Sequence, residues 1–113
     1  MKIVKKSAAI YHKNEDTCIA FEYPMEFKDI DCATAEIAGR YPSKGVAVNE
    51  ISKMFVYVIA GSGKLNIDGN DIQLDEGDLA CIEPGEKYYY NGIMKIFLPC
   101  TPAWNKEQYK IIE

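Results

Sequence analysis

Phe55-Val-Tyr-Val-Ile-Ala-Gly61-Ser-Gly63 is the stretch that decides the fold of this 113-residue chain. It opens as an unbroken run of β-branched and aromatic residues, which is typical of a buried strand, and it ends in glycines. From there on, glycines recur at intervals of 8, 8, 8 and 7 residues, at Gly61, Gly69, Gly77, Gly85 and Gly92. Short strands separated by turn residues at this interval predict an all-β sandwich or barrel.

The dipeptides at these glycines are turn formers. Asp68-Gly69 and Asn91-Gly92 readily adopt positive φ in tight hairpins, and Pro84-Gly85 is a further turn pair. The spacing of Asn105 and Gln108 is that of a capping box and predicts one helical turn near the C-terminus. We expect strands at residues 17–23, 31–38, 46–51, 54–60, 63–67, 71–74, 78–82, 87–90 and 94–98.

Two stretches carry a family resemblance. Residues 55–63 resemble the end of the first cupin motif, and Gly77-Asp-Leu-Ala-Cys-Ile-Glu-Pro84-Gly85 resembles the start of the second. The short hairpin around Asp68-Gly69 gives the separation that cupins have between these motifs. The resemblance covers about residues 40–92. It implies a double-stranded β-helix, the jelly-roll barrel, as a single domain over residues 1–113, and it implies a homodimer.

Cupins usually hold a metal with two histidines and a glutamate from the first motif and one histidine from the second. Carried over by position, these ligands fall on residues of other types: Val48, Glu50, Met54 and Tyr88. Only Glu50 could ligate a metal well, and iron, zinc and manganese need several converging imidazole or carboxylate ligands. The substituted motifs therefore predict a barrel without a metal or other cofactor, unless Cys81 or Cys100 points inward.

In a barrel without a metal, the interior is a candidate ligand pocket. Glu50 is either a pocket acid or a solvated carboxylate at a strand end, because the alternation over 46–51 does not fix which face is inside. A slip of one residue would place Asn49 there instead. His12, the only histidine, could act as a general base only if the N-terminal strand crossed the pocket mouth. The pocket candidates are Asn49, Glu50, Met54, Tyr88, Tyr90, Arg40 and Trp104.

Several of these candidates also have a plain structural interpretation. Tyr88 and Tyr90 share a face of an extended segment, and they either bind a ligand or fill the space that a metal has left. Arg40 could grip a carboxylate or phosphate, or pair with a surface carboxylate. Met54 is expected to pack in the core, and Trp104 to dock the C-terminal tail onto the barrel.

Charge and cysteine content exclude several classes of protein. The formal net charge is −4, from 13 basic and 17 acidic residues, and the only basic cluster is Lys2, Lys5 and Lys6, so we expect no nucleic-acid partner. No run approaches the ~20 apolar residues of a membrane span. The four cysteines form no CxxC pair. We expect a cytoplasmic protein with reduced thiols.

Two main functions remain open. The first is a metal-free barrel that binds a small carbohydrate-like or polar metabolite. The alternative is a metal-independent isomerase or epimerase of the sugar type, with Glu50 as base and a tyrosine as acid. A metal-dependent cupin enzyme ranks last because the ligands are missing. Exposed sheet edges also favour a homodimer.

Overall fold

The computed structural model describes all residues from 1 to 113, and most of them lie in nine strands. The two helices are single 3-10 turns, η1 (Lys6–Ala8) and η2 (Lys106–Gln108). No helix is long and apolar enough to span a membrane. The strands are β1 (Ile10–Glu15), β2 (Cys18–Glu22), β3 (Asp31–Tyr41), β4 (Val46–Asn49), β5 (Lys53–Ile67), β6 (Asn70–Asp75), β7 (Leu79–Ile82), β8 (Tyr88–Thr101) and β9 (Tyr109–Ile112).

Strand β8 is the central element of the sheet. It pairs antiparallel with β3 along one edge, from Asp31 opposite Cys100 to Tyr41 opposite Tyr90, and with β5 along the other. Strand β5 also pairs with β7 through its first half and with β6 through its second half. The β1–β2 hairpin extends the sheet beyond β3, and β9 pairs with β4.

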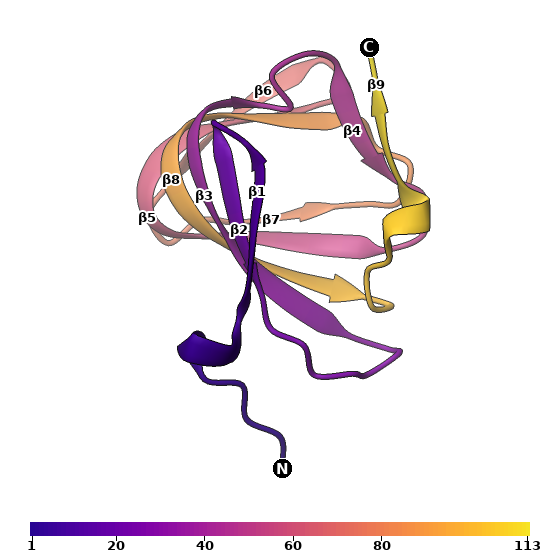
Figure 1. The fold of residues 1–113 in the computed structure, drawn as a ribbon. Coiled ribbons are helices and arrows are strands. Elements are labelled where there is room, and N and C mark those ends of the chain that lie inside the picture. The colour runs from indigo at the N-terminus through magenta and orange to yellow at the C-terminus, as the bar shows by residue number, and fades with distance from the viewer.

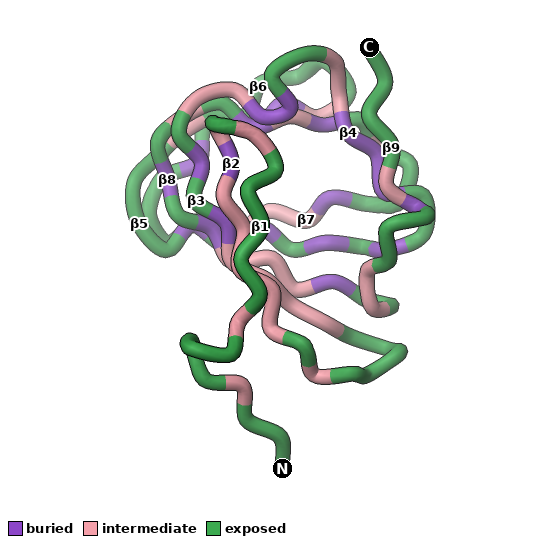
Figure 2. The backbone as a smooth tube through the Cα atoms, viewed as in Figure 1, coloured by how far each residue is buried: buried purple, intermediate pink, exposed green.

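The long strands β3, β5 and β8 curve so strongly that each contributes to two facing layers (Figure 1). We call these the lower layer, which holds β7 and residues 53–58, 96–101 and 31–35, and the upper layer, which holds β4, β6, β9 and residues 62–67, 88–93 and 39–41. Buried residues occur in both layers (Figure 2), and they form one hydrophobic cluster. The all-β jelly-roll barrel expected from the sequence is confirmed.

Two predicted turns are confirmed and one is wrong. Asp68-Gly69 connects β5 to β6 with φ angles of 49° and 88°, and Gly85 has a φ of 85°. Asn91-Gly92, by contrast, lies inside β8. Gly92 is opposite Gly63 of β5, and a Cβ at residue 92 would overlap the Cα of Gly63. This glycine allows two backbones to approach closely, rather than forming a hairpin.

The terminal parts of the fold match the sequence predictions less completely. The helical turn is confirmed at η2, where the Asn105 side chain accepts the backbone N–H of Gln108 at 3.1 Å. Strands β1 and β9 were not predicted. Five of the six residues of β1 are exposed, so its sequence lacks the apolar alternation that would have revealed a strand. Figure 2 shows β1 lying across the front of the barrel.

Candidate functional site

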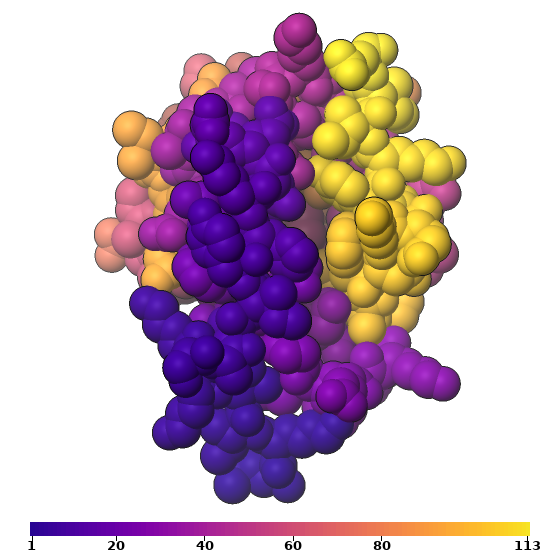
Figure 3. Space-filling view, viewed as in Figure 1, coloured from indigo at the N-terminus to yellow at the C-terminus, as the bar shows by residue number.

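A cavity of about 730 Å³ lies between the two layers. Its lining includes residues of the β1–β2 hairpin, of the loop 23–27 and of the C-terminal segment 103–109. Figure 3 shows the surface hollowed between the indigo N-terminal strands and the yellow C-terminal segment. Pockets for small molecules usually measure about 300–1,000 Å³, so this cavity has the size of a ligand site. Five of the seven sequence candidates line it: Asn49, Met54, Tyr88, Tyr90 and Trp104.

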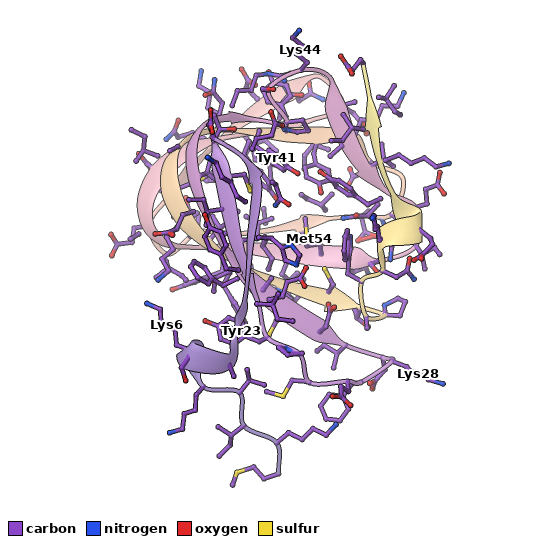
Figure 4. The ribbon with its side chains drawn as sticks, in the orientation of Figure 1. Lys6, Tyr23, Lys28, Tyr41, Lys44 and Met54 are labelled. Carbon is purple, nitrogen blue, oxygen red and sulfur yellow. The ribbon has the colours of Figure 1, made fainter.

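The two layers give the cavity walls of different chemistry. The upper layer supplies four tyrosines, Tyr41, Tyr88, Tyr90 and Tyr109, while the lower layer supplies the carboxylate of Asp31 and apolar and thiol groups that include Met54. Figure 4 shows Tyr41 and Met54 extending from opposite layers into the space between them. The hydroxyl groups of Tyr41 and Tyr109 are hydrogen-bonded at 2.9 Å, and the rings of Tyr88 and Tyr90 meet edge to face at 5.6 Å.

The hydroxyl of Tyr90 has no hydrogen-bond partner. Tyr90 is only 3% exposed, and it is one of the residues that line the cavity. Leaving a buried polar group unsatisfied costs about 1–3 kcal/mol, and such a group calls for an explanation. A hydroxyl of this kind in a ligand-sized cavity is suited to bind a polar group of a ligand.

Asn49 connects three elements around the cavity. Its Oδ1 accepts a hydrogen bond from the indole N–H of Trp104 at 2.9 Å, and its Nδ2 donates to the hydroxyl of Tyr88 at 3.4 Å. Its backbone carbonyl accepts the N–H of Gly85 at 2.8 Å. Trp104 thus fastens the C-terminal segment to β4 and β8, as expected for a residue that docks the tail.

Glu50 and Arg40 do not line the cavity, and the structure corrects both placements. Glu50 lies beyond the end of β4, and its exposed carboxylate forms an ion pair with Lys110 at 2.8 Å. The guanidinium of Arg40 lies 3.8 Å over the ring of Tyr89 and donates to the carbonyl of Pro42. Because side chains alternate along a strand, the neighbouring residues, Asn49 and Tyr41, face inward instead.

The mouth of the cavity carries functional groups that neither motif contains. Strand β1 borders this mouth, so His12 lines it, and His12 Nε2 lies 3.3 Å from a carboxylate oxygen of Glu22 on β2. The geometric condition for a role of His12 is therefore met. Asp31, at the start of β3, and Lys106 also line the cavity. Sequence reasoning missed Glu22, Asp31 and Lys106, because only the fold brings them together.

Burial keeps the tyrosines of the cavity neutral. It raises the pKa of Tyr88 and of Tyr90 well above the ordinary value, and it raises the pKa values of Tyr41 and Tyr109 as well. These groups are therefore hydrogen-bonding hydroxyls and not bases. Burial also raises the pKa of Asp31, and the backbone N–H of Trp104 acts in the opposite direction.

Solved structures with the same fold come from several bacteria. Pac13, a nucleoside dehydratase of Streptomyces, matches with a TM-score of 0.91 and 16% identity, over 100% of this chain and 92% of that one. An RmlC-like cupin from Shewanella frigidimarina matches with a TM-score of 0.72 and 13% identity, over 89% of each chain. This chain has the cupin fold.

Further solved structures share this fold. KdgF from a Halomonas species matches with a TM-score of 0.74 and 12% identity, over 89% of this chain and 94% of that one. Variants of Pac13 solved with uridine match with a TM-score of 0.91. No family model matches the chain, and no curated protein sequence matches it either.

The residues in this barrel do not fit the metal that cupins usually hold. The side chains near the expected ligand positions that line the cavity are Asn49, Met54 and Tyr88. They offer an amide, a thioether and a neutral phenol, which together make a poor site for iron, zinc or manganese. No three His, Cys, Asp or Glu side chains lie close enough to one another to hold an ion. Cys100 does line the cavity, whereas Cys81 does not.

Proposed function

We propose that this chain binds a small polar metabolite containing a flat ring, of the nucleoside kind, in the cavity of its cupin barrel. The observation that carries the proposal is the buried hydroxyl of Tyr90, which has no partner, on a residue that lines a cavity of about 730 Å³. Aromatic walls bury the faces of a flat ring well, while a few hydroxyl groups fix its orientation. The 0.91 TM-score to a protein solved with uridine supports the nucleoside class over a carbohydrate.

The proposed binding mode uses the two chemistries of the cavity. The tyrosines of the upper layer hydrogen-bond the ligand, and Met54 of the lower layer packs against its ring. Tyr88 already accepts a hydrogen bond from Asn49, so its own O–H proton is available to an acceptor on the ligand. Tyr90 supplies both a free proton and free lone pairs.

Calorimetric titration with uridine, other nucleosides and monosaccharides tests the proposal. For the nucleoside that binds, Tyr90→Phe should weaken affinity about tenfold, because one buried hydrogen bond is worth about 1.4 kcal/mol of binding. Tyr89→Phe is the matched control, since Tyr89 does not line the cavity and lies under the guanidinium of Arg40. Unchanged affinity in Tyr90→Phe, or the absence of saturable nucleoside binding, contradicts the proposal.

A second candidate is a metal-independent acid–base enzyme. The pair formed by His12 and Glu22 at the cavity mouth favours it, because a carboxylate can orient an imidazole that exchanges a proton with a ligand. Glu50 is not suited to the role of base, since it lies outside the cavity and pairs with Lys110. The test uses NMR to measure whether C–H protons of the ligand exchange with deuterium in D₂O in the presence of the protein. If the wild type catalyses exchange and His12→Gln binds the ligand but does not, the acid–base enzyme is supported. If the wild type catalyses no exchange, this second candidate is contradicted.

A further inference from the structure

The charges around the cavity are unevenly distributed. Three carboxylates line it, those of Glu22, Glu26 and Asp31, whereas the only lysine among its lining residues is Lys106. The remaining titratable cation, His12, is already paired with Glu22. The four buried tyrosines are neutral, so they contribute no charge to the lining. The lining is therefore net negative with His12 either neutral or protonated.

Lys2 and Arg40 do not reverse this balance. Lys2 does not line the cavity; its ammonium donates to the carbonyl of Met25 at 2.6 Å and lies 4.6 Å over the ring of Phe27. Arg40 could bind a phosphate or carboxylate, but its guanidinium does not line the cavity and contacts Tyr89 and Pro42 instead. No arginine lines the cavity, so the planar, two-point donor that best recognises phosphate is missing.

We propose that the cavity selects its ligand by charge: it takes an uncharged or amine-bearing molecule and rejects phosphorylated and carboxylated ones. This inference rests on the proposed function for the identity of the site, and it narrows the ligand class from nucleotides and nucleosides to nucleosides and their amino derivatives. Tyr90 is the independent sign that the space receives a ligand, since its buried hydroxyl has no partner within the protein.

The physical basis is repulsion in a partly enclosed space. Water screens exposed charges strongly, but the effective dielectric constant falls near a protein surface and inside a cavity, so like charges repel more there. Asp31 is the most important group, because its carboxylate lines the cavity and is partly buried. An anionic ligand would have to approach it without a compensating arginine. An ammonium group would be attracted, and the aromatic walls would also stabilise it.

The first test needs no ligand, because a native thiol reports the charge of the cavity. Cys32 lines it, next to Asp31, and is partly exposed. Its modification rate is measured by mass spectrometry with two methanethiosulfonates of similar size, one carrying a trimethylammonium group and one a sulfonate. The ratio of the two rates is divided by the same ratio for a small free thiol. This cancels the thiolate fraction, which is the same for both reagents.

We expect this normalised ratio to favour the cationic reagent by about tenfold at physiological ionic strength. The double variant Asp31→Asn with Glu22→Gln should reduce it at least threefold. Glu50→Gln is the matched control, because it removes a carboxylate outside the cavity, and it should leave the ratio unchanged. A ratio at or below one in the wild type overturns the inference, as does a ratio that the double variant does not alter.

The second test compares uridine, uridine 5′-monophosphate and 5′-amino-5′-deoxyuridine by calorimetry. The phosphate should bind at least about tenfold more weakly than uridine, the amine at least as tightly, and the double variant should narrow the difference. Equal or tighter binding of the phosphate overturns the charge selection while leaving nucleoside binding intact. If uridine does not bind, the proposal that the cavity binds this nucleoside fails. The ratio of the two modification rates of Cys32 still decides whether the cavity discriminates by charge.

Discussion

The indole N–H of Trp104 donates a hydrogen bond of 2.9 Å to the side-chain oxygen of Asn49, across 55 residues of sequence. Asn49 is 2% exposed and lies beside a position where the family resemblance would place a metal-binding histidine. In this barrel that region is occupied by a structural hydrogen bond. This bond helps to hold the C-terminal segment against the cavity, together with the hydrogen bonds of Gln108 and the pairing of β9 with β4.

Trp104→Phe should therefore destabilise the fold by about 1–3 kcal/mol, because the buried oxygen of Asn49 loses its donor. Urea denaturation measures the change. In the background of Asn49→Ala, where no acceptor remains, the same substitution should cost at least about 0.5 kcal/mol less. Equal costs in the two backgrounds would mean that Trp104 acts only through the area that it buries.

The sequence predicted the layout of the barrel well, because glycine spacing and apolar alternation are local signals. It predicted the site less well, since Glu50 and Asn49 differ by one position, and only the three-dimensional register decides which of them faces inward. His12 was recognised only conditionally. Asp31 was missed because no local pattern indicates that the start of β3 meets the backbone of Trp104, 73 residues later.

Removing the hydroxyl of Tyr90 should not destabilise the free protein. That group has no partner, so Tyr90→Phe should leave the unfolding free energy unchanged or raise it by up to about 1 kcal/mol. Tyr41→Phe is the comparison, because it removes the hydrogen bond to Tyr109 and should cost about 1 kcal/mol. Thermal unfolding without ligand distinguishes them. A clear loss of stability in Tyr90→Phe would indicate a partner for its hydroxyl, such as an ordered water molecule.

Asp31 should make the protein less stable as the pH rises, which is the opposite of what a carboxylate with a lowered pKa does. Burial raises its folded pKa above the ordinary 3.8, so the folded chain holds the proton more tightly than the unfolded chain does. The contribution of Asp31 to stability is therefore most favourable below pH 3.8, and it falls as the pH rises through the folded pKa.

Asp31→Asn should consequently raise the melting temperature at pH 7 and have less stabilising effect at pH 3. Asp16→Asn is the control, because the hydrogen bond and ion pair with Lys13 lower the pKa of that carboxylate. Melting curves of both variants at the two pH values measure the effect. A stabilisation by Asp31→Asn that is larger at pH 3 than at pH 7 would reverse the assigned sign.

An apolar outer face on the lower layer is where we expect the homodimer to form. Leu79 of β7, Tyr57 of β5 and Phe97 of β8 form one row across three paired strands, and Phe55 lies on the same face of β5 as Tyr57. Leu79 is 60% exposed and Tyr57 is 42% exposed. The row itself contains no charged residue, although Lys53 and Lys95 flank it on the same face, so a second copy related by a two-fold axis can pack its own apolar row there.

Light scattering at micromolar concentration should accordingly give about twice the 12.7 kDa mass of the chain. Leu79→Lys should yield the monomer, because it places a charge, which would have to lose its water, on the most exposed side chain of the apolar row. The control Ile72→Lys alters an exposed isoleucine on β6 of the upper layer and should remain dimeric. A wild-type monomer contradicts the homodimer, and a dimer that persists in Leu79→Lys places the interface on another face.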